Sequence, residues 1–536
     1  MAMKNQYDVA IIGGGHNGLV AAAYLARTGL NVGVLEARPV VGGAAVTEEF
    51  HPGFRNSLAA YTVSLLDPRV IADLGLADHG LRIVERRMSN FLPLDDGRAL
   101  EMGGDPANTR RSIAQFSNTD ADQLTAYGAM LDGVVAELRA LVHETPPNLG
   151  GGWREALKAL ALGNRLRRVG LARQRDLMDL FAKSAGDMLD SWFESAPLKA
   201  ALGFDGIVGS YASPYTPGTA YVLLHHVFGE VNGKPGAWGH AIGGMGAITQ
   251  AMAKAATAAG ADLITAAPVR EIVTSAGRAN GVVLADGRRV SAHAVAGNVH
   301  PKRLLGEMLD PALLDADLKR RLAGYRSGSG VVRMNVALSE LPRFTARPAA
   351  GDHLTSGIII APSLDYMDRA YGDARRAGWS AAPIVEMLIP STLDDSLAPP
   401  GQHVASLFAQ AFDPELKALG GGASWDDHRD SVADLIIDTV DAHAPNFKAS
   451  VLARRVLTPL DLERELGLIG GDIFHGQLTP DQLFSARPLL GHGAYRMPVK
   501  GLYLCGSGAH PGGGVSGLPG RNAAREMIRD FRWRRA

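Results

Sequence analysis

The chain has 536 residues, of which 46% are hydrophobic and 20% are charged, as expected for a protein that buries a large apolar core. A formal net charge of −1 gives no reason to expect a nucleic-acid partner. The single cysteine, Cys505, excludes an internal disulfide and any mechanism that needs a redox-active cysteine pair. No apolar run reaches the roughly twenty residues of a membrane span and no leader sequence is visible, so we expect a cytoplasmic protein.

The first forty residues predict a β-α-β unit. Tyr7 to Ile12 is an apolar run typical of a buried parallel strand, Asn17 to Arg27 is predicted to be a helix, and Asn31 to Leu35 is a second apolar strand. The loop between the first strand and the helix carries glycines in the G-x-G-x-x-G spacing of a dinucleotide-binding turn.

Each residue of this motif has a physical task. Gly13 allows the tight turn, Gly15 allows a pyrophosphate to approach the backbone, and Gly18 allows helix and strand to pack closely. The start of the helix offers free N–H groups and a partial positive charge to the phosphates. Glu36 ends the second strand, where its carboxylate can accept hydrogen bonds from both ribose hydroxyls.

Arg38 and the doublet Gly42-Gly43 extend the motif to E-x-R-x-x-x-G-G. This extension resembles the FAD-binding fingerprint of the glutathione-reductase-like flavoproteins, in which the second glycine pair lies against the FAD pyrophosphate. We therefore expect FAD rather than a nicotinamide dinucleotide. The predicted cofactor-binding residues of this region are Gly13, Gly15, His16, Asn17, Gly18, Glu36, Ala37, Arg38, Gly42, Gly43 and Ala44.

A hairpin and a long helical insertion are predicted next. Ser89 to Leu100 is predicted to turn at Asp96-Gly97, and the pattern from Asp105 to about Pro197 is helical. Within the insertion, residues 153–181 combine leucines with lysines and arginines at helical spacing. Such a basic amphipathic segment is typical either of a solvated helix over a protein core or of a peripheral contact with an anionic membrane.

A second part of the nucleotide domain is predicted between Gly239 and His300. A glycine-rich turn opens a helix that runs to about Ala259, and four strands follow at 263–266, 269–274, 281–285 and 291–296. This order is similar to the second half of the FAD domain in glutathione-reductase-like folds. In that family the residue that matches Val269 holds the adenine through its backbone.

The remaining sequence predicts a substrate domain and a return to the nucleotide domain. Residues 327–470 contain apolar strands at 331–338, 357–360, 383–389 and 403–409 and a helix at 431–443, which we interpret as a mixed sheet. Leu502 to Cys505 is predicted to be a buried strand, followed by a glycine-rich loop and a helix at 522–531. The N-terminal amides of this helix are expected to face an electron-rich ring oxygen.

Three separated stretches, GGGHNG…EARPVVGGAA, GGMGAITQAMAKAA and LYLCGSGAHPGGGVSG, together resemble the phytoene-desaturase-like FAD oxidoreductases. GGDIFHGQLTPDQLFSARP resembles a signature of the branch whose animal members are called pyridine nucleotide-disulphide oxidoreductase domain-containing proteins. The resemblance covers essentially the whole chain. Phe54-Arg55-Asn56-Ser57 departs from the carotenoid desaturases proper, so the resemblance does not extend to a carotene substrate.

The resemblance implies an α/β fold, in which a glutathione-reductase-like, Rossmann-type FAD-binding domain carries an inserted substrate domain of mixed sheet and helices. Residues 1–90, 236–326 and 481–536 would form the FAD domain, 91–235 the helical insertion and 327–480 the substrate domain. FAD would be held non-covalently, with its ring near Gly506, Ser507, Gly514, Val515, Ser516 and Gly517. A substrate cavity would lie between the two domains on the open face of the flavin.

The sequence does not identify the catalytic residues, because a flavin dehydrogenase needs little more than a substrate C–H held close to flavin N5. The candidates are His240, Trp238, His475 and His510. His225, His226 and Arg487 are further residues that could face the cavity. A structural role is the alternative for each of them and for Cys505. The histidine spacing predicts no metal site.

The favoured hypothesis is an FAD-dependent dehydrogenase or desaturase that transfers hydride from a C–H of an apolar substrate, such as a polyene or lipid-like molecule, to flavin N5. The alternatives are an FAD amine or amino-acid oxidase that uses O2, a redox-neutral flavin isomerase, and a flavin-binding scaffold without turnover. O2, a quinone and NAD(P) are the candidate electron acceptors. The oligomeric state does not follow from the sequence.

Overall fold

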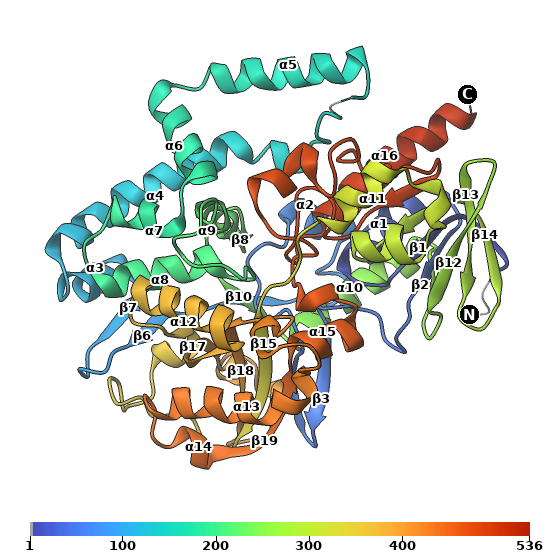
Figure 1. The fold of residues 1–536 in the computed structure, drawn as a ribbon. Coiled ribbons are helices and arrows are strands. Elements are labelled where there is room, and N and C mark those ends of the chain that lie inside the picture. The colour runs from blue at the N-terminus through green and yellow to red at the C-terminus, as the bar shows by residue number, and fades with distance from the viewer. Residues whose placement is uncertain (1–3, 149, 536) are drawn as a thin grey trace.

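The computed structural model describes residues 4–148 and 150–535, and a seven-stranded sheet organises its first domain (Figure 1). Across the sheet lie β11 (Asp262–Ile264), β2 (Val32–Leu35), β1 (Gln6–Ile12), β14 (Arg289–Gly297), β13 (Arg278–Leu284) and β12 (Val269–Ser275), and β20 (Leu502–Leu504) pairs with β14. The central strands run parallel, whereas β12 to β14 form an antiparallel meander. This is the Rossmann-type FAD-binding sheet that the sequence predicts.

Three helices that are far apart in the sequence pack together beside this sheet. They are α1 (His16–Ala26), α10 (Met245–Ala258) and α16 (Leu518–Arg535). Close packing is possible because α1 and α10 are rich in alanine and glycine and nearly all of α1 is buried. The predicted strands and helices of this domain are confirmed, with ends shifted by at most four residues.

A second seven-stranded sheet forms the floor of the substrate domain. Its strands, in order, are β19 (Val451–Leu457), β15 (Val331–Leu338), β18 (His403–Phe412), β17 (Trp379–Leu388), β16 (Gly357–Ile360), β6 (Asn90–Pro93) and β7 (Ala99–Met102). β16 and β6 are parallel and the other neighbours antiparallel, so the predicted mixed sheet is confirmed. The predicted hairpin supplies β6 and β7 and adds them to strands from much later in the chain.

Alternate residues of this second sheet face two separate apolar cores. Val331 packs in the core under α12 (Leu364–Ala377), whereas its neighbour Val332 packs in the core under α13 (Trp425–Asp441). The period of two in a strand explains why adjacent side chains enter different cores. Two short helices complete this part, α14 (Phe447–Ser450) and α15 (Pro459–Leu466).

Helices form the roof over the substrate domain. They are α3 (Pro106–Ala114), α4 (Asn118–Leu138), α5 (Trp153–Arg167), α6 (Leu171–Ala182), α7 (Ala185–Asp190), α8 (Ala196–Ile207) and α9 (Ala220–Val227). The other short elements are β3 (Thr47–His51), β4 (Phe54–Ser57), α2 (Pro68–Leu74), β5 (Ile83–Glu85), β8 (Glu230–Val231), β9 (Lys234–Pro235), β10 (Gly239–Ala241) and α11 (Ala316–Ala323).

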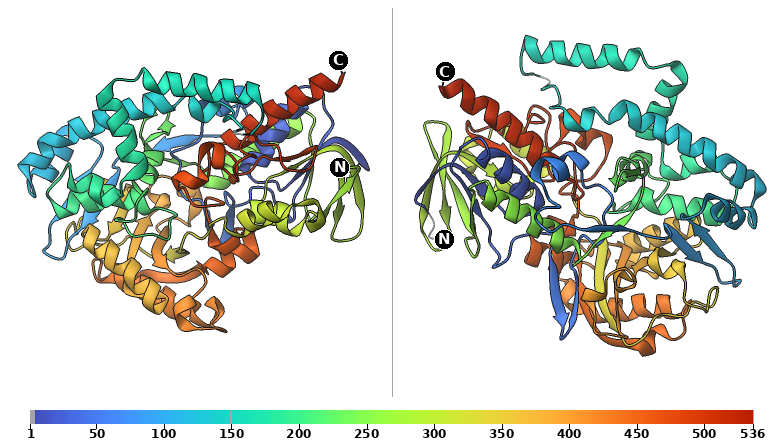
Figure 2. Two further views of the ribbon diagram at one scale, coloured as in Figure 1. Left: turned by 45° about the horizontal axis from the view of Figure 1, so that its top comes forward. Right: turned by 180° about the vertical axis from the view of Figure 1, so that it is seen from behind.

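The amphipathic segment at 153–181, for which the sequence leaves open a solvated helix over a core or a membrane contact, is helical. It forms two helices, α5 and α6, with Gly170 at the start of the second. None of the residues of α5 is buried, and Figures 1 and 2 show α5 standing at the edge of the molecule. Within residues 4–148 and 150–535, no helix is long and apolar enough to cross a membrane.

Candidate active site

A cavity of about 620 Å³ joins the glycine-rich loop after β1 to the roof of the substrate domain. Gly13 and Gly15 line one part of it, whereas Phe204, Asp205 and Val208, at the end of α8, line another. The nucleotide motif and the substrate domain therefore face one continuous space.

Twelve of the predicted cofactor-binding residues line this cavity. They are Gly13, Gly15, His16, Glu36, Ala37, Arg38, Gly43, Ala44, Val269, Ser507, Gly514 and Val515. The other six, Asn17, Gly18, Gly42, Gly506, Ser516 and Gly517, do not line it. Asn17, Gly18 and Gly42 contact residues that do, namely Ser507, Gly13 and Gly15. The three stretches that are separated in sequence thus meet at one place.

Gly18 and Gly506 show why this region needs glycine. A Cβ atom on Gly18 would lie 2.3 Å from the carbonyl oxygen of Gly13, so that helix α1 could not approach β1 as it does. A Cβ on Gly506 would lie 3.0 Å from Asn298 Oδ1. The close packing predicted for Gly18 is therefore confirmed.

The carboxylate of Glu36 is held in place by backbone amides. Its Oε2 accepts a hydrogen bond from Gly14 N at 2.7 Å, and its Oε1 accepts one from Arg38 N at 2.8 Å. The side chain is 93% buried and lines the cavity close to Val269. Each oxygen keeps an acceptor site for a hydroxyl, which suits the predicted contact with ribose.

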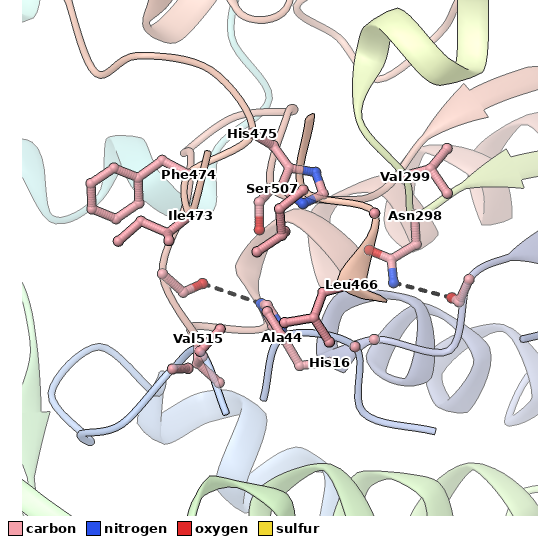
Figure 3. A pocket seen from close by; sticks show the side chains of 18 of the residues that line it. His16, Ala44, Asn298, Val299, Leu466, Ile473, Phe474, His475, Ser507 and Val515 are labelled. Carbon is pink, nitrogen blue, oxygen red and sulfur yellow. Dashed lines mark hydrogen bonds between the residues drawn. The ribbon is translucent and has the colours of Figure 1, made fainter. Parts of the chain in front are cut away.

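Asn298 is a site residue that the sequence reasoning passed over. Its Nδ2 donates to the carbonyl oxygen of Gly13 at 3.1 Å, and the residue lines the cavity (Figure 3). Its position directly after β14 was the available signal, because ligands bind at the carboxyl ends of parallel strands.

Hydrogen bonds fasten the C-terminal glycine-rich loop to helix α1. His16 Nε2 donates to Gly514 O at 3.1 Å (Figure 3), and Asn17 Nδ2 donates to Ser507 Oγ at 3.2 Å. Burial lowers the pKa of His16 to about 4, against the effect of the bond to Gly514, so the ring is neutral at pH 7. The imidazole is thus a hydrogen-bond donor at this site and not a charge.

The loop after η8 (Ile469–Gly471) brings Ile473, Phe474 and His475 to the cavity wall opposite Val515 (Figure 3). Arg487, which is fully buried, donates hydrogen bonds to the carbonyl oxygens of Phe474 and Ser507 at 2.7 and 2.8 Å. Arg487 therefore joins this loop to the C-terminal glycine-rich loop and does not itself line the cavity.

The four catalytic candidates separate into two pairs. Trp238 and His475 line the cavity, whereas His240 and His510 do not. His240 Nε2 lies 3.1 Å from Asp394 Oδ2, and His510 Nε2 lies 2.9 Å from the carbonyl oxygen of Leu141. His240 therefore pairs with a carboxylate, and His510 with the backbone of the helical insertion. This bond fits the structural role that the sequence leaves open for His510, because its ring turns toward the helical insertion.

Cys505 and His225 also lie outside the main cavity. The Cys505 thiol is buried and donates to Gly297 O at 3.4 Å, and burial raises its pKa to about 12. His225 packs between Tyr221 and Phe474. These positions fit the structural alternatives that the sequence leaves open.

A cluster of buried charged and aromatic residues closes the far part of the cavity, and only two of its members were expected. Tyr61 donates to Glu386 Oε2, and the guanidinium of Arg333 lies 4.3 Å from the centre of the Tyr61 ring. Arg86 donates to Thr62 Oγ1 and lies over the Trp238 ring. Tyr61, Asp205, Glu386, His226 and Trp238 line the cavity.

The two carboxyl groups of this cluster have raised pKa values. Burial raises the pKa of Asp205 to about 7, although Arg86 opposes the change. Burial also raises the pKa of Glu386, against the effects of Arg86 and of the Tyr61 hydroxyl. No sequence signal pointed to these residues, because they come from α8 and β17 and meet only in the folded protein.

The nucleotide end of the cavity fits FAD. Gly15, the N-cap residue of helix α1, has no side chain to cap the helix. The first N–H groups of α1 are therefore free to bind a pyrophosphate. His475 Nδ1 is buried beside the cavity and has no hydrogen-bond partner in the described part of the chain. The Glu36 carboxylate can bind a ribose. The start of α1 and Glu36 thus match the pyrophosphate and the ribose of a dinucleotide, and His475 Nδ1 is free to bind a further polar group.

Comparison with known proteins agrees with this geometry. Residues 18–404 match the family model described as flavin-containing amine oxidoreductase. The chain belongs to this family. It is therefore an FAD-dependent oxidoreductase, in the phytoene-desaturase-like branch that the sequence motifs indicated.

Two relatives and one solved structure illustrate the similarity. The rat "Pyridine nucleotide-disulfide oxidoreductase domain-containing protein 2" is 43% identical over 99% of this chain and 94% of its own length. A "Phytoene desaturase (lycopene-forming)" of Pseudescherichia vulneris is 26% identical over 97% of this chain and 99% of its own. Cyclohexylamine oxidase of Brevibacterium oxydans shares the fold, with a TM-score of 0.58, 16% identity and coverage of 98% and 99%.

Proposed function

We propose that this oxidoreductase is a dehydrogenase of the desaturase type, which removes hydride from a C–H bond of an apolar substrate. One observation carries the proposal, namely that the cavity continues from the FAD motif into an apolar space. Its walls there are formed by Ala59, Ala60, Leu65, Phe204, Val208, Ile473 and Phe474. The similarity to a phytoene desaturase also supports a substrate of this class.

The residues of the chain would act by position. When bound, FAD supplies a two-electron acceptor for hydride. The Ala60 N–H donates to Ala44 O, which ties the apolar wall to the second glycine doublet of the cofactor site. A substrate against this wall would therefore lie next to the cofactor with little water between them, and such placement provides much of the rate enhancement of a hydride transfer.

Anaerobic reduction of the bound FAD tests this proposal. The purified yellow protein is mixed without oxygen with limonene (a terpene hydrocarbon), with cyclohexylamine and with NADPH, and the flavin absorbance is followed. Bleaching by limonene, with slow reoxidation in air and faster reoxidation by a soluble quinone, is the expected result. Bleaching by cyclohexylamine alone, with rapid peroxide release in air, would replace the proposal by an amine oxidase.

A further inference from the structure

The carboxyl group of Asp205 stands in a place that costs the protein stability. It lies in the last turn of α8, which ends at Ile207, where the negative end of the helix dipole disfavours a carboxylate. Its neighbours Phe204 and Val208 turn to the same cavity and are apolar. No hydrogen bond to Asp205 is present among the described residues. The carboxyl group therefore has no local hydrogen bond that would offset the cost of placing an acid there.

The two other ionisable groups in this part of the cavity wall, Glu386 and His226, already have hydrogen-bond partners. Glu386 accepts from the Tyr61 hydroxyl and lies beside Arg86, whose charge influences its pKa. His226 donates through Nδ1 to Val222 O at 2.9 Å, and burial lowers its pKa, so its ring is a weak base. Asp205, in contrast to Glu386 and His226, has no hydrogen-bond partner among the described residues, and its pKa is about 7.

The charged groups around Asp205 can support a change in its protonation. Arg86, Glu386 and the buried Tyr127 hydroxyl all interact electrostatically with it. Arg86 stabilises the carboxylate form, while burial and Glu386 stabilise the protonated form. The two forms therefore have similar free energies near neutral pH, which is the condition for an efficient general base.

We propose that the Asp205 carboxylate is the proton acceptor of the oxidation, a role that rests on the proposed function above. As hydride passes from one substrate carbon to FAD, the neighbouring carbon loses a proton to an oxygen of Asp205. The electron pair of that second C–H bond forms the new double bond. The substrate thus loses one hydride and one proton, FAD takes up the two electrons, and Asp205 holds the proton until solvent removes it.

Asp205→Asn tests the proposal, since it keeps the size of the side chain and removes the base. With limonene as reductant and FAD bound, we expect the rate of anaerobic FAD reduction to fall about 100-fold or more. The dependence of the wild-type rate on a group with a pKa near 7 should disappear, and the limonene concentration for half-maximal rate should change little. Asp122→Asn, an exposed carboxyl on α4 that pairs with Arg110, is the matched control.

A second measurement does not depend on the substrate. In the FAD-loaded protein, infrared spectroscopy should show a carboxylic acid band that titrates near pH 7 and is absent in Asp205→Asn. A mutant that keeps both the wild-type rate and the band would overturn the assignment, and so would the absence of the band in the wild type. A wild-type protein that shows the band but is not reduced by limonene would contradict the proposed substrate class alone. If Asp205→Asn does not fold, Asp205→Glu should keep the titration and part of the rate.

A separate observation concerns helices α5 and α6. Five of the nine large hydrophobic side chains that are most exposed in the described residues lie here, namely Trp153, Leu157, Leu160, Leu171 and Met178. Trp153, Leu157 and Leu160 recur at helical spacing on one side of α5 and are 55–69% exposed. Near its C-terminal end α5 contacts the body of the protein, where Arg165 donates to Glu137 O.

The same segment is strongly basic. Residues 153–178 contain seven lysines and arginines and two acids, in a chain whose net charge is −1. Arg173 is turned inward to Met130 O and Glu155 is tied to Asn148 N, but Arg154, Lys158, Arg167, Arg168 and Arg175 are exposed around the apolar stripe. An exposed apolar stripe with a basic border matches an anionic lipid surface in both polarity and charge.

The geometry points to α5 and the start of α6 as a surface that docks on anionic lipid. Vesicles of phosphatidylglycerol and phosphatidylcholine test this with the full FAD-loaded protein. We expect co-sedimentation with phosphatidylglycerol vesicles, weaker binding at about 0.5 M NaCl, and no binding to pure phosphatidylcholine. The double variant Leu157→Glu/Leu160→Glu should bind about tenfold less, while Leu313→Glu/Leu419→Glu, on exposed leucines elsewhere, should bind like the wild type.

Equal binding by both double variants would overturn this assignment, and so would the absence of sedimentation with phosphatidylglycerol. A dimer in light scattering that Leu157→Glu/Leu160→Glu dissociates, without vesicle binding by the wild type, would identify the stripe as a contact between two copies of the chain.

Discussion

His16 Nε2 lies 3.1 Å from the carbonyl oxygen of Gly514, so the first turn of helix α1 holds the loop that closes the cofactor site nearly five hundred residues later. The neighbouring contact of Asn17 with Ser507 makes the same connection. Both ends of the chain therefore have to be folded before either glycine-rich loop has its final shape. This explains why the FAD site is assembled from the two extremes of the sequence.

Replacing His16 by alanine should loosen the C-terminal loop. The loss of one buried hydrogen bond, together with an unpaired Gly514 carbonyl, costs about 1–3 kcal/mol, and we expect the dissociation constant of FAD to rise about tenfold. Fluorescence of released FAD on dilution measures the change. His293→Ala, at an exposed histidine that contacts Asp8, should leave FAD affinity unchanged, and equal affinities of all three proteins would contradict the role given to His16.

Gly18→Ala should destabilise the nucleotide domain. The added Cβ would meet Gly13 O at 2.3 Å, and relieving such a clash in a close-packed region costs about 1–3 kcal/mol. The measurement is the free energy of unfolding in urea, together with the FAD content after purification. Gly163→Ala is the matched control, because Gly163 lies inside helix α5 with no atom near its added Cβ. There we expect no loss of stability and a gain of about 0.5–1 kcal/mol.

Arg487→Lys should strongly lower the free energy of unfolding, although the substitution keeps the positive charge. The Arg487 guanidinium serves carbonyl oxygens of Phe474, Gly476, Gln482 and Ser507, and a lysine cannot reach them all. Leaving buried carbonyls unpaired should lower the free energy of unfolding by about 3 kcal/mol or more.

The control for Arg487→Lys is Arg326→Lys. Arg326 is an exposed arginine that pairs with Asp481 in the same region, and its replacement should cost less than about 1 kcal/mol. Thermal unfolding of the FAD-loaded proteins compares the two, and similar losses would show that Arg487 does not fasten the loops together.

The free energy of unfolding should fall as the pH is lowered from 6.5 to about 4, before most carboxylates are protonated. Burial lowers the pKa of His225 and His475 to about 3 and of His16 and His510 to about 4. Between pH 6.5 and about 4 the unfolded chain binds protons at these rings and the native protein does not, so stability falls as the pH falls. The raised pKa values of Asp205, Glu386 and Asp472 act in the opposite direction over this range. The histidines with lowered pKa values, which also include His226 and His300, outnumber these carboxyl groups.

Each such histidine adds about 1.4 kcal/mol per pH unit to this slope. Urea unfolding at several pH values between 4.5 and 6.5 measures the slope for the wild type and for His225→Phe, which removes one of the rings. The slope of the variant should be smaller by the contribution of one histidine. An unchanged slope would show that His225 is not held neutral in the native state.

The nucleotide half of this protein could be predicted because its residues act locally. The turn after β1 needs Gly13 and Gly15 for reasons that involve only neighbouring backbone and a phosphate, and Glu36 follows its strand by a fixed distance. Such requirements leave a pattern in the sequence. The hairpin at β6 and β7 was predictable for the same reason, but not its place in the sheet, since β16 lies more than 250 residues away.

The order of residues along the chain thus determined the FAD-binding motifs, the elements around them and the family. Only the tertiary structure decided that Asp205, Glu386 and Tyr61 share one cavity, and that His240 and His510 have partners outside it. It also decided that α5 leaves its apolar stripe uncovered. The physical reason is that burial and proximity set the pKa and the availability of a side chain, and both depend on neighbours distant in sequence. A motif depends on residues that are close in the sequence, whereas the environment of a carboxyl group depends on the packing of the whole fold.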